Sequence, residues 1–267
     1  MLCCPKCKEK LTKSDHVYTC SNHHSYDIAK RGYVNLLLGN HKSVGDDKAM
    51  IVARTKFLNH GYYQCLREHL TQIVKELAPV VLIDAGCGEG YYTNQFKDAL
   101  PKSTIIGFDL SKSGVDHACT SHTGVLYSVA SVFQLPLDNA CSDAIISVFA
   151  PIDEKENARI LKEKGYFLKV GPAAKHLWEL KEFLYQDVYK NVEDKSTYEL
   201  FTLVKEETLT YTITLDNQED IWALFQMTPY YWKTSKEAVE KLKALSILTT
   251  LVSFHIELYQ KKEANLQ

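Results

Sequence analysis

The sequence predicts an α/β protein in which a doubly wound, mostly parallel sheet follows a small cysteine-rich module. Between residues 80 and 190, short apolar segments alternate with segments of helical spacing, an order typical of doubly wound sheets. A glycine-rich turn follows the first apolar segment, and four of the eight cysteines lie within the first 20 residues. We therefore predict a front module over residues 1–38, a linker with helices over 39–78, and a sheet domain over 79–267.

The front module contains Cys4 and Cys7, which are separated by two residues. Twelve residues separate Cys7 from Cys20 and three separate Cys20 from His24, and residues 17–19 have the pattern of a strand. Two thiolates on a tight turn, met by a second pair of ligands from a short hairpin, form the closed tetrahedral site of structural zinc. The predicted ligands are Cys4, Cys7, Cys20 and His24.

Two neighbours of these residues are also candidate ligands. Cys3 is one residue out of the two-residue spacing, so we do not expect it to bind metal. His23 lies beside His24, and the choice between them stays open at this point. The alternative to a zinc site is a flexible tail with free thiols, but a module of this size needs a staple to hold a fold.

The composition indicates a globular protein of the cytoplasm. Hydrophobic residues make up 45% of the chain and charged residues 24%, and no run of 18 apolar residues occurs. The first residues lack the apolar stretch and cleavage site of a secretion signal. In the reducing cytoplasm, paired cysteines more often bind metal than form disulfides. We expect no membrane partner.

Charge is distributed unevenly along the chain. Residues 1–75 contain 12 Lys or Arg and 6 Asp or Glu, whereas the remainder contains 19 and 27. A positive front on an acidic body fits an anionic partner that docks at one end. Chance variation of the surface is the alternative explanation.

The elements of the sheet domain follow in order after an aromatic and basic segment at 26–37 and a polar loop at 39–47. Helical spacing over residues 48–77 ends at Pro79. Five short strands are predicted at 80–84, 104–109, 125–129, 144–149 and 165–170, with helices at 91–100, 112–122 and 176–188. Alternating segments at 208–214 and 248–259 predict antiparallel strands at the end of the sheet.

The turn after the first strand, residues 84–91, is the central motif. Its glycines Gly86, Gly88 and Gly90 are spaced G-x-G-x-G and precede a helix. A dinucleotide-binding loop would have its third glycine at position 91, where Tyr91 stands. An aromatic residue there does not suit close packing beside a pyrophosphate, so the loop favours a ligand without phosphates, such as S-adenosylmethionine.

Asp109 ends the second strand, 23 residues after Gly86. A carboxylate at this position can accept hydrogen bonds from both ribose hydroxyls of a nucleoside cofactor. Enzymes that bind NAD use the same device, so Asp109 does not choose between cofactors, whereas the loop does. The alternative is a sheet with unused glycine turns.

The motifs resemble those of class I methyltransferases, through Asp84 to Gly90, Asp109, and residues 134–137 leading into 142–144. More specifically, the chain resembles the bacterial 23S rRNA guanine-N1-methyltransferases of the RlmA type. The resemblance spans nearly the whole chain and rests on the front module and on the strings at 29–37, 86–92, 171–172, 176–177 and 179–181.

This resemblance implies a Rossmann-like class I methyltransferase sheet behind a zinc ribbon that recognises RNA. It also implies S-adenosylmethionine as cofactor, 23S rRNA as partner, and N1 of one guanine in a hairpin loop as methyl acceptor. A homodimer is suggested by the same likeness.

By the same likeness, Tyr63, Gly88, Glu89 and His176 contact the cofactor. Without the likeness, Tyr63 is an ordinary packing aromatic and His176 a surface residue at a helix start. We assign Asp84, Gly86 and Asp109 to the cofactor as well. The position that often carries an acid for the adenine amino group is Ser131, after Ala130. Adenine recognition there would rest on a hydroxyl and backbone groups.

Guanine N1 lies on the Watson–Crick edge and bears a proton, so the base must be unpaired and the proton must leave. Phe149 follows the fourth strand at the carboxyl edge of the sheet, where such substrates enter. We hypothesise that Phe149 or a neighbouring carbonyl orients the base, with a core role as the alternative. Asp27, Asp153 and Glu154 are candidates for the general base, and none is preferred.

Lys30 and Arg31 are predicted to contact RNA phosphates, beside Tyr33 as a stacking ring. A solvated basic turn is the alternative. Three other functions compete: a zinc-ribbon methyltransferase acting on a protein or small molecule, a non-catalytic RNA-binding module, and a nucleotide-dependent dehydrogenase. The intact loop with Asp109 disfavours the second, and the glycine spacing disfavours the third.

Overall fold

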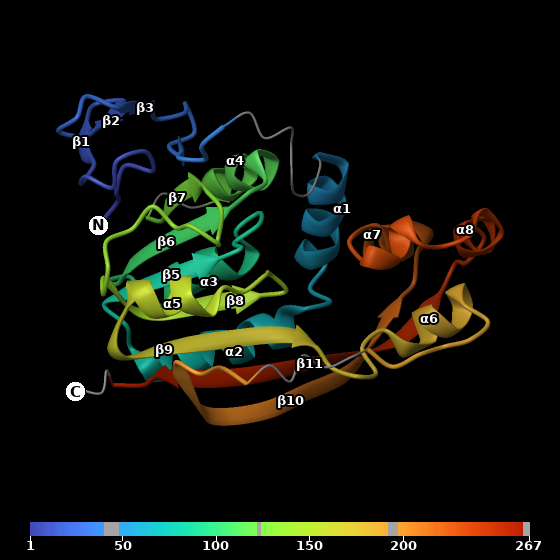
Figure 1. Cartoon of the computed structure of the whole chain (residues 1–267). Helices are drawn as coiled ribbons and strands as arrows, with labels where there is room; N and C mark the ends of the chain where they lie inside the picture. Colours follow the sequence, from blue (N-terminus) through green and yellow to red (C-terminus); the bar gives the residue numbers. More distant parts are fainter. Residues whose placement is uncertain (40–47, 122–123, 192–196, 264–267) are drawn as a thin grey trace.

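The structure is a computed structural model that describes residues 1–39, 48–121, 124–191 and 197–263. Most of the polar loop predicted at 39–47 lies outside these residues. The front module contains a small antiparallel sheet of β1 (Thr12–Ser14), β2 (Val17–Thr19) and β3 (Ser25–Asp27), in the order β1-β2-β3. The strand predicted at 17–19 is confirmed as β2. In Figure 1 the module lies at the upper left, next to β7.

The main sheet has eight strands in the order β10-β11-β9-β8-β5-β6-β7-β4. They are β4 (Val34–Asn35), β5 (Val81–Ala85), β6 (Thr104–Asp109), β7 (Leu126–Val129), β8 (Ser142–Val148), β9 (Leu161–Pro172), β10 (Phe201–Leu215) and β11 (Leu248–Lys261). Strands β4 to β9 pair in parallel, whereas β11 runs antiparallel to both β9 and β10. The five predicted strands and the antiparallel end of the sheet are confirmed.

The helices are α1 (Lys48–Asn59), α2 (Gln64–Leu77), α3 (Tyr91–Ala99), α4 (Lys112–Ser121), α5 (Glu154–Ile160), α6 (Trp178–Leu184), α7 (Gln218–Gln226) and α8 (Lys236–Lys243), with a 3-10 turn η1 (Pro229–Trp232). The helical pattern over residues 48–77 is divided in two because Gly61 has a φ of 84°, a left-handed conformation that interrupts a helix. No helix in the described part of the chain is long and apolar enough to cross a membrane.

Both faces of the sheet are buried. On one face Leu82 and Ile146 pack in a cluster that includes side chains of α2 and α3. On the other face Ile83 and Ile145 pack in a cluster that includes α5 and Leu11 of the front module. This alternation along β5 and β8 follows from the two-residue period of a strand.

The front module is attached to the sheet domain at two places. Strand β4 pairs with β7, with Asn35 opposite Val129, so the predicted front module supplies the outermost strand of the main sheet. Leu2 forms an antiparallel bridge with Leu137, next to a hydrogen bond from the Cys3 amide to the Pro136 carbonyl. These contacts fix the module beside the end of β7.

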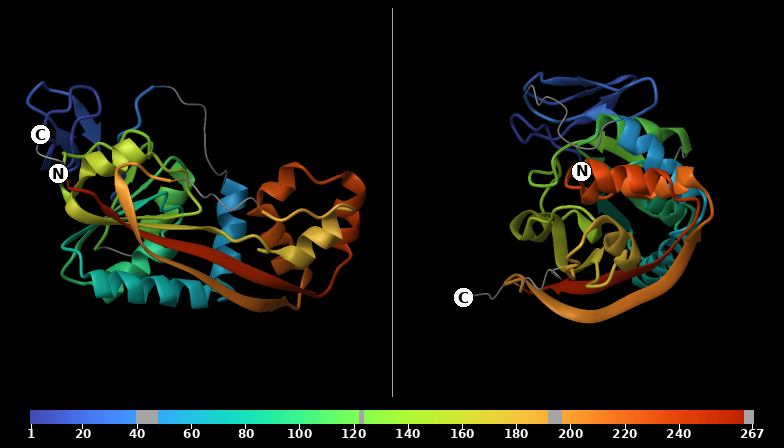
Figure 2. Two further views of the ribbon diagram at one scale, coloured as in Figure 1. Left: turned by 60° about the horizontal axis from the view of Figure 1, so that its bottom comes forward. Right: turned by 90° about the vertical axis from the view of Figure 1, so that its right-hand side faces the viewer.

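Helices α6, α7 and α8 form a lobe beyond the ends of β10 and β11, and α1 stands between this lobe and the sheet (Figures 1 and 2). An ion pair between Lys56 and Glu219 joins α1 to α7. On its other side α1 faces the carboxyl edge of the parallel strands, since Arg54 lies against Gly88 after β5 and Ile51 against Gly114 after β6.

Candidate zinc centre and cofactor site

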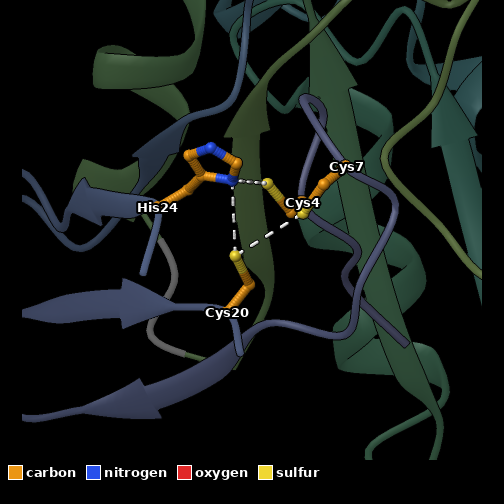
Figure 3. A group of neighbouring side chains, drawn as sticks. All are labelled: Cys4, Cys7, Cys20 and His24. Atoms are coloured by element: carbon orange, nitrogen blue, oxygen red, sulfur yellow. Dashed lines mark hydrogen bonds between the residues drawn. The ribbon is translucent and has the colours of Figure 1, made fainter. Parts of the chain in front are cut away.

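The predicted metal ligands Cys4, Cys7, Cys20 and His24 lie together in the front module, with their ligand atoms within 4.8 Å of one another (Figure 3). His24 Nδ1 lies 3.4 Å from Cys4 Sγ and 3.5 Å from Cys20 Sγ, and the sulfurs of Cys7 and Cys20 are 3.7 Å apart. A tetrahedral zinc ion with ordinary bond lengths separates its ligands by about 3.6 Å for S and N and about 3.8 Å for two sulfurs. The four residues therefore fit zinc.

The two neighbouring candidates, Cys3 and His23, do not join the metal ligands. Cys3 Sγ donates a hydrogen bond to Asp138 Oδ1 at 3.0 Å, and burial together with this bond raises the pKa of the Cys3 thiol to about 12. His23 is exposed and takes a left-handed φ of 59°, whereas His24 lies among the cysteines. Between the two histidines, the structure places His24 in the cluster.

The glycine loop joins β5 to α3 and turns sharply at Gly86, where φ is 97°. A Cβ atom at this position would lie only 2.2 Å from the Cβ of Ala150, so glycine is required by both conformation and space. The amides of Gly86 and Cys87 both donate to the carbonyl of Phe108, at 2.8 and 3.0 Å. These hydrogen bonds hold the loop against the end of β6, where Asp109 lies.

Asp109 at the end of β6 is held by the backbone on both sides. Its Oδ2 accepts a hydrogen bond from the Gly88 amide at 2.9 Å and its Oδ1 from the Ser111 amide at 2.7 Å. A carboxylate oxygen can accept more than one hydrogen bond. The geometry suits a carboxylate that is oriented in advance to bind the two hydroxyls of a ribose.

Asp84 lies beneath the loop. Its side chain is 2% exposed, and Thr93 donates a hydrogen bond to its Oδ2 at 2.5 Å. Burial raises the pKa of Asp84 to about 7. This carboxylate supports the loop from the sheet and joins it to α3.

Tyr63 and His176, 113 residues apart in sequence, meet in the core. Tyr63 Oη lies 3.4 Å from His176 Nε2, and both side chains are buried. The Ser253 amide donates to His176 Nδ1 at 3.2 Å, so the ring proton belongs on Nε2. Burial lowers the pKa of His176 to about 4, and the ring is therefore neutral at physiological pH.

Phe149 packs beside His176. Its ring centroid is 5.9 Å from that of His176 and 5.9 Å from that of Phe254, yet its side chain is 46% exposed. The backbone of Phe149 has a left-handed φ of 55°, which is uncommon for a bulky residue and is found most often at functional sites. The predicted base-orienting residue and two predicted cofactor residues thus share one aromatic cluster.

The adenine end of the predicted site lies after β7. Ala130 is buried, and its amide donates to the Asp109 carbonyl at 3.1 Å. Ser131 is partly exposed, and its hydroxyl accepts a hydrogen bond from the Phe133 amide at 3.3 Å. Ala130 therefore lies beside Asp109, and Ser131 follows it in the chain.

The three candidate bases have other partners or positions. Asp153 caps the start of α5 by accepting from the Glu156 amide, and Glu154 accepts from the Leu200 amide at 2.6 Å. Asp27 is exposed on β3 of the front module. No general base is assigned among them.

The prediction for Tyr33 is wrong. Its ring is 4% exposed and packs with Val115, Ala118 and Tyr127, so it cannot stack on an RNA base. The reason is tertiary: Tyr33 immediately precedes β4, whose pairing with β7 brings the ring under α4. Arg31 is exposed but forms an ion pair with Asp116 at 2.9 Å, and Lys30 is exposed.

One charged residue at the loop escaped the sequence analysis. Arg54 of α1 reaches Glu89, with Nε and Oε2 2.6 Å apart. The side chain of Glu89 is 7% exposed and that of Arg54 21%. The sequence hints at this role only by placing a cation among the apolar residues of a predicted helix. Such a cation ordinarily lies on the solvent-exposed face of its helix.

Comparison with known proteins covers both parts of the chain. A family model described as "RlmA, N-terminal", a zinc ribbon, matches residues 2–44, and a methyltransferase-domain model matches residues 82–171. The chain is 30% identical over 266 residues to the 23S rRNA (guanine(748)-N(1))-methyltransferase of Streptomyces fradiae, covering 95% of both chains. It is 30% identical over 261 residues to a Bacillus subtilis (strain 168) protein named as a candidate 23S rRNA guanine-N1-methyltransferase, covering 92% of both.

A third relative is a candidate 23S rRNA guanine-N1-methyltransferase of Micromonospora griseorubida. It is 33% identical over 202 residues, which make up 68% of each chain. The similarity to the first two relatives runs through the front module, the linker helices and the sheet domain alike.

Proposed function

Because the chain belongs to the RlmA-type family of 23S rRNA guanine-N1-methyltransferases, we propose that it transfers a methyl group from S-adenosylmethionine to N1 of a guanine in a hairpin loop of 23S rRNA. The observation that carries the proposal is the juxtaposition of the glycine loop and Asp109 with a zinc-binding front module. Similarity to a named enzyme of this activity over 95% of the chain supports it.

The cofactor supplies an electrophilic methyl group on a sulfonium, and the residues around the glycine loop suit its binding. Asp109 is placed to accept both ribose hydroxyls, and Ala130 and Ser131 lie beside it for the adenine. The tight turn at Gly86 lets the ligand approach the backbone. We assign Glu89, Tyr63 and His176 to the other end of the cofactor.

The protein's part in the transfer is alignment and exclusion of water. We propose that the half-exposed ring of Phe149 receives the unpaired guanine at the carboxyl edge of β8. His176 is not available as the base that removes the N1 proton, because its Nδ1 accepts from Ser253 and its Nε2 carries the proton. Its neutral ring instead supports Phe149 from the interior.

RNA docks on the front module in this proposal. Lys6, Lys8, Lys10, Lys13 and Lys30 are exposed there, and a cluster of cations attracts the phosphate backbone. The zinc is structural, because four protein ligands leave no open position. Lys30 and Arg31 remain proposed phosphate contacts, with Arg31 exchanging Asp116 for a phosphate.

The proposal extends to the oligomeric state of the protein and to its location in the cell. A homodimer would present two front modules to one RNA, and sedimentation of the pure protein at micromolar concentration tests it. A single species of monomer mass would remove the dimer from the proposal. We propose a cytoplasmic location, because the ribosomes that carry the rRNA substrate lie there.

The proposal is tested by incubating the protein with labelled S-adenosylmethionine and 23S rRNA from a strain that lacks the modification. We expect one methyl group per rRNA, located at the guanine equivalent to position 748 of the Streptomyces relative's substrate. A methyl on N1 blocks the Watson–Crick edge, so reverse transcription stops at the modified base. Asp109→Ala should abolish labelling. Label on protein or small molecules, or on a different base atom, would contradict the proposal.

A further inference from the structure

Arg54 of α1 lies over the glycine loop. Its guanidinium covers the middle of the glycine loop, since a Cβ built on Gly88 would lie 2.9 Å from Arg54 Nη2. One turn earlier, α1 packs on α4 beside the loop, since a Cβ on Gly114 of α4 would lie 3.3 Å from Ile51 Cδ1 and 3.0 Å from the carbonyl oxygen of Gly88. Arg54 is therefore held over the loop by the packing of its helix.

Acidic side chains gather around the glycine loop. Asp84, Glu89 and Asp109 surround the loop with carboxylates, and Glu89 is paired with Arg54 in a nearly buried position. A nearly buried ion pair costs free energy when either partner loses its counter-ion. A ligand that displaces one member must supply a replacement charge to the other.

The methionyl part of the cofactor has the charges needed, because it carries an α-carboxylate and an α-ammonium group. Resting on the proposed function, we infer that Arg54 binds the α-carboxylate of this methionyl group while Glu89 receives its α-ammonium. The ion pair between Arg54 and Glu89 opens to admit the zwitterion. Each protein group exchanges one opposite charge for another, so the site stays electrically balanced.

The position of Gly88 agrees with this order of groups. Its amide donates to Asp109 Oδ2 at 2.9 Å, on the ribose side, and its Cα lies beneath the Arg54 guanidinium. Asp109, proposed for the ribose, and Arg54, proposed for the amino-acid group, therefore lie on either side of Gly88. This closeness agrees with the short sulfur-containing link that joins the ribose to the amino-acid group in the cofactor. The planar fork of arginine matches a carboxylate with two parallel hydrogen bonds.

The test separates the amino-acid group from the rest of the ligand. Titration calorimetry compares S-adenosylhomocysteine with 5′-methylthioadenosine, which keeps the adenosine and the sulfur but lacks the amino acid. We expect Arg54→Met to weaken S-adenosylhomocysteine about 10- to 100-fold and to leave methylthioadenosine within about twofold. Arg54→Lys should recover part of the loss, and Glu89→Gln should also act on S-adenosylhomocysteine alone.

Lys56→Met is the matched control, because it removes a cation from the same helix that pairs with Glu219 of α7. Its affinity for both ligands should equal that of the unchanged protein. Equal weakening of both ligands by Arg54→Met would mean that Arg54 only packs the loop, and would overturn the inference. So would an unchanged affinity for S-adenosylhomocysteine with weaker RNA binding, since Arg54 would then contact phosphate.

The same experiment distinguishes failure of the proposed function from failure of the role inferred for Arg54. If the unchanged protein binds neither ligand, the methyltransferase assignment fails and the inference fails with it. If it binds both but labels no rRNA, the substrate is wrong, while the role of Arg54 is still decided by the comparison of the two ligands. Binding of methylthioadenosine by Arg54→Met also demonstrates that the variant is folded.

Discussion

Adjacent residues at the start of the chain have opposite environments. Cys4 Sγ lies among the proposed metal ligands and within 3.2 Å of the Tyr26 hydroxyl, whereas Cys3 Sγ faces Asp138 of the sheet domain. Successive side chains of an extended segment point to opposite sides. One cysteine is therefore available to stabilise the front module, and its neighbour helps to attach that module to the sheet domain.

His176 shows how burial determines the protonation state of a side chain. Its ring is almost fully buried, its Nδ1 accepts from a backbone amide, and its pKa is lowered to about 4. A cationic ring would lose hydration at this position without gaining a carboxylate partner in the described contacts. The neutral ring is compatible with aromatic packing against Phe254.

Protonation of His176 should destabilise the fold on the acid side. In the unfolded chain the histidine binds a proton below about pH 6.5, whereas the folded chain resists until about pH 4. Falling pH therefore favours unfolding within this window. We expect His176 to account for about 2 kcal/mol of lost stability between pH 7 and pH 5. Urea unfolding at the two pH values, compared with His176→Gln, measures this contribution.

The other titrating groups are common to both proteins and cancel in the comparison. An identical pH dependence for the two proteins would show that His176 has the same pKa in the folded and the unfolded chain, and would contradict this account. The packing of the neutral ring contributes equally at both pH values, so it changes the free energy of unfolding of His176→Gln by the same amount at each.

At the scale of elements, the glycine loop depends on contact with a neighbouring strand end. Gly86 follows β5 and Ala150 follows β8, and these strands are adjacent in the sheet. Their carboxyl ends approach so closely that one residue of the pair must lack a side chain. The loop conformation is thus a property of two strands, not of the loop sequence alone.

Gly86→Ala should therefore disrupt the loop. The added Cβ would lie 2.2 Å from that of Ala150, at a φ of 97° that L-residues rarely adopt. We expect a loss of at least about 2 kcal/mol of stability and of most S-adenosylhomocysteine binding. Gly171→Ala in β9 is the control, because its Cβ meets nothing within 4 Å. Denaturant unfolding and calorimetry measure both effects, and equal losses in the two variants would refute this account.

At the scale of the whole molecule, the front module and sheet domain share a core. Leu2, Leu11 and Tyr18 of the module pack in the same cluster as Leu135 and Leu137 of the sheet domain. The shared cluster, the β4–β7 pairing and the ion pair of Arg31 with Asp116 hold the module in one orientation. A fixed orientation is what an enzyme needs when it grips RNA at one place and modifies a base at another.

Replacing Lys30 and Arg31 with alanine should weaken RNA binding without affecting the cofactor. Each lost phosphate contact lowers the slope of log affinity against log salt by about 0.7 to 0.9. Filter binding of an rRNA hairpin at several salt concentrations measures the slope, and calorimetry should give unchanged S-adenosylhomocysteine affinity. Lys102→Ala, an exposed cation just before β6 at the amino edge of the sheet, is the control. An unaltered slope in the double variant would place the RNA elsewhere.

The sequence alone predicted those parts of the protein that depend on short-range spacing. The zinc ligands, the glycine loop and Asp109 are each defined within about 25 residues, and the five predicted strands are short, mostly apolar segments. Such patterns constrain local backbone geometry directly. The resemblance to a methyltransferase family added Tyr63 and His176, which no local pattern would have linked.

Tertiary structure alone decided which distant side chains meet. It buried Tyr33 under α4, brought Tyr63 against His176, and placed Arg54 over Glu89. Each of these contacts joins elements through the pairing of strands or the packing of a helix face, and the sequence spacing between the partners carries no information about it. Helical and strand periodicity shows which face of an element is apolar, but the partner of that face is selected only when the whole sheet assembles.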